Sequence, residues 1–173
     1  MVTYTLDNFR LPGYLYRVQY EGSWTTYTPS RDLQAAAQYT SWQGEEDFHG
    51  SMRSHYDWRS GVPSPFISTF WDAEHAARWG RCLAQARSAI VLTISTRELY
   101  QSNLVFRGYG PHELLFLRGV PARAIIAETS LVQFGLCVCS FYQKFSLRKL
   151  QRRRLVCTCM HTIAYSSDMM KPL

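Results

Sequence analysis

The residues of this sequence best suited to chemistry stand in three short, β-prone segments. The segments are YLYRV with Arg17, PSPFISTFWD with Ser68, and HELLFLRGVPARAII with Glu113. A guanidinium is a planar fork of donors that stays charged, which suits phosphate and sugar oxygens. A carboxylate stabilises positive charge that develops in a transition state, and a serine hydroxyl can keep the arginine side chain in position. The three residues can act together only if the fold brings their segments side by side.

Each of these residues also has a purely structural explanation. Arg17 could pair with an acid such as Asp57, Ser68 sits in ordinary strand sequence, and Glu113 could be a solvated residue at the start of a strand. Because large aromatic side chains dominate cores, core positions are expected for Trp58, Trp71 and Trp79. The histidines at 49, 55, 75 and 112 share no metal-ligand spacing, so no metal site is predicted.

The elements that must position these residues follow from local patterns. Ser30 can cap a helix from Arg31 to about Tyr39, and 41–61 is expected to be a long functional or covering loop with about one helical turn. Asp72 can cap a helix that continues to about Arg87, in which Ala76, Trp79, Leu83 and Ala86 recur at helical spacing. Strands are predicted at 15–19, 66–70, 89–95 (covered on both faces), 104–106, 113–117 and 122–127. This order predicts an α+β domain on a mixed or mainly antiparallel sheet with flanking helices.

Composition and charge narrow the function classes. The chain has 173 residues, 46% hydrophobic and 14% aromatic, which is typical of one globular domain. Its formal net charge of +6 lies entirely in residues 134–173, since residues 1–133 hold 12 arginines and 12 acidic residues. A nucleic-acid partner is therefore not expected for the main domain. No secretory segment is predicted and no run nears the roughly 18 apolar residues of a membrane span, so we expect an intracellular, monomeric protein, in the cytoplasm or the nucleus.

The order of the three segments resembles the Arg–Ser–Glu class of ADP-ribosyltransferases. In that class an arginine on the first strand, a Ser-Thr-Ser element and a glutamate that opens a strand surround NAD. The segments are also similar to an uncharacterised fungal domain family with a PSPFIST stretch, a His-Ala-x-x-Trp helix (here from His75 to Trp79) and a His-Glu strand. The resemblance spans Tyr14 to Glu128.

The resemblance implies ADP-ribosyl transfer or NAD glycohydrolysis, with Glu113 as the catalytic carboxylate beside an oxocarbenium-like transition state. It implies that NAD is bound by Arg17, Ser68, Thr69, Phe70 and Trp71, with His112 as a neighbour of the site. NAD would be the substrate, and the acceptor, which could be a protein, is not named by the sequence. Two departures, Phe70 at the third Ser-Thr-Ser position and Pro111 two residues before the glutamate, favour the alternative of a binding module without turnover.

Residues 131–173 differ in composition from the expected domain at residues 10–130. This tail contains an apolar stretch, 131–142, that could pack on the domain, and four of the five cysteines in two CxC pairs whose spacing is not that of a usual zinc site. It also holds basic runs at 148–149 and 152–154, which leave a weaker alternative of nucleic-acid association through the tail. The tail is expected to be dispensable for folding, so that a chain truncated after Glu128 stays folded.

Overall fold

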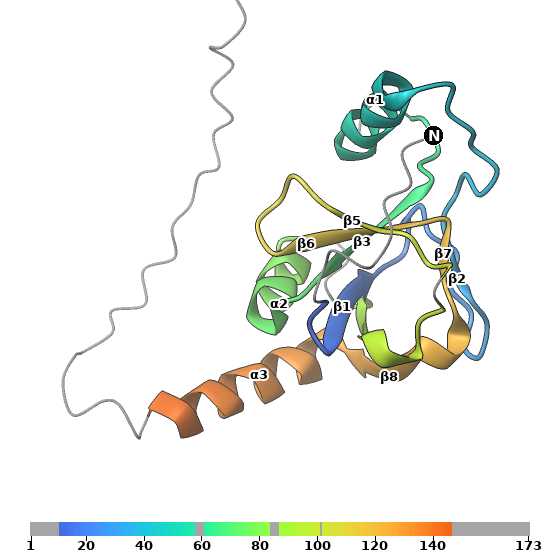
Figure 1. Ribbon diagram of the computed structural model, residues 1–173. Coiled ribbons are helices and arrows are strands. Elements are labelled where there is room, and N and C mark those ends of the chain that lie inside the picture. Colours follow the sequence, from blue (N-terminus) through green and yellow to red (C-terminus); the bar gives the residue numbers. More distant parts are fainter. Residues whose placement is uncertain (1–10, 58–60, 84–86, 101, 147–173) are drawn as a thin grey trace, which may run out of the picture.

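The protein is an α+β domain built on a six-stranded antiparallel sheet (Figure 1). The computed structural model describes residues 11–57, 61–83, 87–100 and 102–146, with side chains described as far as Val138. In chain order the elements are β1 (Tyr14–Gln19), β2 (Leu33–Gln34), α1 (Glu45–Tyr56), β3 (Phe66–Phe70), α2 (Ala73–Arg81), β4 (Ile90–Ser95), η2 (Thr96–Glu98), β5 (Val105–Arg107), β6 (Glu113–Leu117), β7 (Gly119–Val120), η3 (Ala122–Ala124), β8 (Ile125–Ser130) and α3 (Leu131–Ser146), where η marks a 3-10 helix. The predicted fold class is confirmed.

The sheet is divided at its centre. Its strand order is β5-β6-β3-β1-β4-β8, so β3 and β1 are the two central strands. Register pairs run along the whole of β1 with β4 and the whole of β3 with β6, but β1 and β3 pair only at Tyr16 and Phe70. The two antiparallel halves therefore share one register pair, and the Arg17 side chain donates to the Ser68 carbonyl across the same junction.

Both faces of the sheet are covered. Leu92 and Ile94 of β4 pack into a core shared with β2 and β7, whereas Val91 packs on the other face against α2 and α3. This confirms the expectation that the strand near residues 89–95 is buried on both sides. A third cluster lies under α1, which stands at the opposite end of the molecule from α3 (Figure 1).

The helix after β3 begins as expected. The Asp72 side chain caps α2 by accepting a hydrogen bond from the backbone N–H of His75 at 2.6 Å. The helix ends at Arg81, earlier than predicted, because the N–H groups of Cys82 and Leu83 each bond a carbonyl three residues back and tighten the last turn. Ala86 lies outside the described residues.

The helix predicted from Arg31 to Tyr39 is wrong. Leu33 is fully buried in β2, which pairs with β7, and Ala35 donates its backbone N–H to the carbonyl of Arg118. Ser30 has a φ of 63°, whereas a helix N-cap is typically extended. The helix propensity of the three alanines is thus overridden by long-range strand pairing.

The loop predicted over residues 41–61 is also wrong, because most of it is the 12-residue helix α1. Three acidic residues in its first turn stabilise the positive end of the helix dipole. Phe48, Met52 and Tyr56 recur every four residues and pack together into the third cluster with Phe66 of β3. After β7, the strand expected at 122–127 begins later than predicted, because the 3-10 helix η3 takes up Ala122–Ala124 before β8.

The packed unit continues beyond the boundary expected at residue 130. Leu131 and Phe134 of α3 are only 3% and 8% exposed and belong to the core cluster under α2. The approach of α3 to α2 is close, because a Cβ added at Gly80 would lie 2.7 Å from Leu131 Cδ1. The first turns of α3 are therefore part of the core, which argues against a fold that is complete at Glu128. Cys157, Cys159 and the basic runs lie outside the described residues.

A chain truncated after Glu128 is expected to lose its cooperative unfolding transition. It would expose the core surface under Leu131 and Phe134, and removing one large buried apolar side chain typically costs about 2–5 kcal/mol, against a total stability of about 5–15 kcal/mol. Thermal unfolding followed by circular dichroism shows whether the unfolding transition is cooperative. The control is truncation after Ser146, which retains α3 and should melt cooperatively; equal melting of the two truncated chains would show that α3 is not part of the core.

Candidate functional site

The structure brings the three candidate residues onto neighbouring strands. Arg17 lies on β1, Ser68 on β3 and Glu113 on β6, which are adjacent in the middle of the sheet. The register places Glu113 opposite Phe70, and Phe70 in turn opposite Tyr16. Residues nearly 100 positions apart in the sequence thus meet around the junction of the two sheet halves.

Arg17 occupies the junction where β1 and β3 separate. Its guanidinium donates to the backbone carbonyl of Ser68 at 3.0 Å, to Ser23 Oγ at 2.8 Å and to Thr25 Oγ1 at 3.1 Å. Only 7% of the residue is exposed, and burial lowers its pKa to about 10, so it remains charged at neutral pH.

The buried charge of Arg17 has no ion-pair partner among the residues that the structure describes. Among the described residues no carboxylate lies within 4.0 Å of it, which removes the structural pair with Asp57. Its Nε is buried without a hydrogen-bond partner in the same part of the chain. Burying an unpaired charge is costly, so an anionic group bound here would be favoured.

Glu113 is buried rather than solvated, with 5% of its surface exposed. Its Oε2 accepts hydrogen bonds from the Tyr56 hydroxyl at 2.7 Å and from the Gly110 N–H at 3.1 Å. The same hydroxyl accepts from the backbone N–H of Tyr109 at 3.0 Å, so its own proton is directed to the carboxylate. Burial and the adjacent carboxylate raise the pKa of Tyr56, which keeps it a donor. The carboxylate is therefore held in one orientation.

The backbone approaches Glu113 so closely that two glycines are required beside it. A Cβ added at Gly108 would lie 2.6 Å from Glu113 Oε2 and 2.7 Å from the Tyr56 hydroxyl, and one at Gly110 would lie 2.7 Å from the same Oε2. Any larger residue would displace the carboxylate or its donor.

Gly108→Ala is expected to destabilise the fold by about 1–3 kcal/mol, the typical cost of overpacking a filled site. The matched control is Gly50→Ala inside α1, where the nearest atom to an added Cβ is 3.9 Å away. That change should be neutral or stabilise by up to about 1 kcal/mol, because alanine favours helix. Urea denaturation of both variants measures the difference, and equal stabilities would show that Gly108 does not border a packed carboxylate.

Ser68 is linked to α1 through His55. The Ser68 Oγ lies 2.8 Å from His55 Nε2, and His55 Nδ1 lies 2.6 Å from Ser64 Oγ. Burial, and secondarily the charge of Arg17, lower the pKa of His55 to about 4, so the ring is neutral at physiological pH. Ser68 thus contacts Arg17 by its carbonyl oxygen, whereas its hydroxyl is engaged by a histidine to which the sequence assigned no role.

Two of the other expected NAD-binding residues are fully engaged in packing. Thr69 is fully buried and its hydroxyl donates to the carbonyl of Leu114 at 2.9 Å. Phe70 is buried against Trp79 and His75, with ring centroids 5.6 Å and 5.0 Å away. Neither side chain is available to a ligand in this arrangement.

Trp71 and His112 form a partly exposed aromatic edge beside Glu113. Their ring centroids lie 5.4 Å apart, and the backbone N–H of Trp71 donates to the backbone carbonyl of His112 at 3.0 Å. Arg107 lies over the Trp71 ring at 5.9 Å. His112 has a φ of 60°, and its Nδ1 is the second buried atom without a partner among the described residues. Of the two aromatic residues expected to bind NAD, Phe70 is buried and Trp71 is partly exposed.

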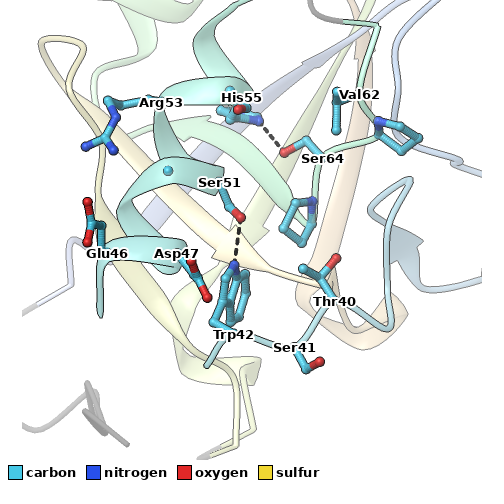
Figure 2. Close-up of a pocket in the computed structure, with 14 residues that line it drawn as sticks. Thr40, Ser41, Trp42, Glu46, Asp47, Ser51, Arg53, His55, Val62 and Ser64 are labelled. Atoms are coloured by element: carbon cyan, nitrogen blue, oxygen red, sulfur yellow. Dashed lines mark hydrogen bonds between the residues drawn. The ribbon is translucent and has the colours of Figure 1, made fainter. Parts of the chain in front are cut away.

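A groove of about 620 Å³, shown in Figure 2, lies next to His55. Segments 40–42 and 62–65 and one side of α1 line it. Arg17, Ser68 and Glu113 are not among its lining residues, but His55 and Ser64 are, and Figure 2 shows the hydrogen bond between them. The groove thus connects to the Ser68 hydroxyl through one histidine.

Within the described ranges, no group of three or more histidine, cysteine or acidic residues is placed to hold a metal ion. No helix in the same part of the chain has the length and apolar character needed to cross a bilayer.

Comparison with known proteins yields one relationship. The family model described as Domain of unknown function (DUF7587) matches residues 10–134, from just before β1 into the first turn of α3. Neither the curated proteins nor the solved structures contain a match. Since the match covers most of the chain, including Arg17, Ser68 and Glu113, the protein belongs to the DUF7587 family.

Proposed function

We propose that this protein cleaves NAD, transferring ADP-ribose to an acceptor or to water. The observation that carries the proposal is the presence of two buried side chains of opposite charge on β1 and β6, the strands on either side of β3. The Arg17 guanidinium has no ion-pair partner in the described structure. Burial lowers its pKa, and Tyr20 and then the Glu113 carboxylate partly oppose that effect. Their order along the chain, with Ser68 between them, is that of the Arg–Ser–Glu transferases.

The reaction needs the groups that these residues offer. The bond between C1′ of the ribose and the nicotinamide nitrogen breaks, and its electron pair stays on that nitrogen, which makes the leaving group neutral. Positive charge develops on the ribose, and Glu113 would stabilise it. Arg17 would bind the phosphate or ribose oxygens of NAD. Water or an acceptor nucleophile then bonds to C1′ and loses a proton.

The test is incubation of the purified full-length chain with NAD, with free nicotinamide and remaining NAD measured by liquid chromatography. Release of nicotinamide in proportion to protein concentration is the expected result, and Glu113→Gln is the negative control. Calorimetric titration with NAD runs in parallel. A chain that neither binds NAD nor releases nicotinamide would overturn the proposal.

A second candidate is a module that binds a nucleotide without turning it over. It is favoured by the small exposure of Arg17 and Glu113 and by Phe70, which fills a core position where transferases of this class carry a serine. NAD binding without nicotinamide release would support this candidate over the enzyme.

A further inference from the structure

The end of α1 contacts two of the three strands that carry the proposed NAD site. His55 and Tyr56, the last two residues of the helix, bond the Ser68 hydroxyl on β3 and the Glu113 carboxylate on β6. Their own rings pack edge to face at 5.2 Å. One helix turn therefore reaches two functional groups on different strands.

The helix is anchored to β3 and β5. Phe48 packs against Phe66 at 5.6 Å and Phe106 at 4.9 Å between ring centroids, and Met52 is buried in the same cluster. Phe66 lies two residues before Ser68, and Phe106 lies two residues before Gly108. Because these contacts fix the helix relative to β3 and β5, the final turn of α1 is held in place over the site.

We infer that Tyr56 and His55 are positioning residues, Tyr56 for Glu113 and His55 for Ser68. Both hydrogen bonds between the carboxylate and the described residues end on Oε2, from Tyr56 and Gly110, which leaves Oε1 as the oxygen to face a ribose hydroxyl. Tyr56 thus sets where the negative charge is placed. This inference rests on the proposed NAD cleavage.

His55 would act on binding rather than on the bond-breaking step. Its neutral ring joins Ser68 to Ser64, and so fixes the rotamer of a hydroxyl that would contact the ribose. Such a contact is present in both the ground state and the transition state, so its loss should raise KM more than it lowers kcat. Loss of Tyr56 should lower kcat more than it raises KM, because charge stabilisation by Glu113 matters most in the transition state.

The experiment is steady-state kinetics of nicotinamide release by Tyr56→Phe and His55→Ala in the full chain, with thermal melting of each variant. Tyr56→Phe should lower kcat by about 10-fold to 100-fold at nearly unchanged KM, the typical cost of a small misplacement of a reacting group. His55→Ala should raise KM by about 10-fold, as expected for losing one good polar contact. Controls are Tyr39→Phe, at a residue that is 94% exposed, and His49→Ala on the same helix.

The outcomes separate the two proposals. If the wild-type chain cleaves NAD and both variants match it, the positioning roles are refuted while NAD cleavage stands. Equal changes in kcat and KM for both variants, together with a lowered melting temperature, would reduce His55 and Tyr56 to structural supports and also refute the roles. A wild-type chain that neither binds nor cleaves NAD would overturn the proposed function and this inference with it.

Discussion

Replacing Glu113 with glutamine is expected to lower nicotinamide release by about 100-fold to 1000-fold, the usual cost of losing one preorganised electrostatic contact to a transition state. The folded structure should survive, although Glu113 is buried. A glutamine oxygen can accept the same hydrogen bonds from Tyr56 and Gly110 that Oε2 accepts, with nearly unchanged shape. Shape is thus retained while the charge is removed.

Three measurements test this expectation: the rate of nicotinamide release, the affinity for NAD by calorimetry, and the melting temperature. The matched control is Glu98→Gln, at an exposed position in η2, which should change none of them. Equal rates for the wild-type chain and Glu113→Gln would remove the catalytic role. Loss of NAD binding in step with loss of rate would instead assign Glu113 to substrate binding.

Arg17→Lys is expected to weaken NAD binding by about 10-fold to 100-fold, because hydrogen bonds to charged groups are worth about 1.5–3 kcal/mol. Lysine keeps the positive charge but cannot reproduce a planar fork of donors. It also cannot reach all of Ser68, Ser23 and Thr25 at once, so we expect a loss of stability of about 1–3 kcal/mol.

Thr25→Val separates these two effects. It removes one acceptor of the guanidinium while leaving Arg17 itself in place. A similar loss of stability is expected with a smaller effect on NAD affinity, measured at fixed ionic strength because phosphate contacts depend on salt. Unchanged NAD affinity in Arg17→Lys would show that the guanidinium only supports the fold.

The sequence predicted the strands of the site well because their signal is local. The runs around Arg17 and Ser68 are rich in β-branched and aromatic residues, and Glu113 is followed by an unbroken apolar run, LLFL; short runs of both kinds are typical of strands. Strand order and the separation of β1 from β3 depend on contacts between distant residues, so the sequence alone could not give them. The same long-range pairing turned the alanine-rich segment after Arg31 into extended chain.

The supporting residues of the site were missed together with α1. Polar and aromatic residues alternate irregularly between Ser41 and Gly61, which suggested a loop. The signal was nevertheless present, as three acidic residues followed by Phe48, Met52 and Tyr56 at four-residue spacing. Recognising that helix would have placed His55 and Tyr56 on one turn, although not over Ser68 and Glu113, because that depends on where the helix packs.

The single register pair between β1 and β3 has a thermodynamic consequence for any ligand of this site. The two halves of the sheet are joined there by Tyr16, Phe70 and the Arg17 guanidinium rather than by a continuous backbone ladder. A molecule held by Arg17 on one half and Glu113 on the other would act as a crosslink between them. Part of its binding free energy would then oppose separation of the halves, so affinity and the rigidity of the sheet would be coupled and could not be altered independently by mutation.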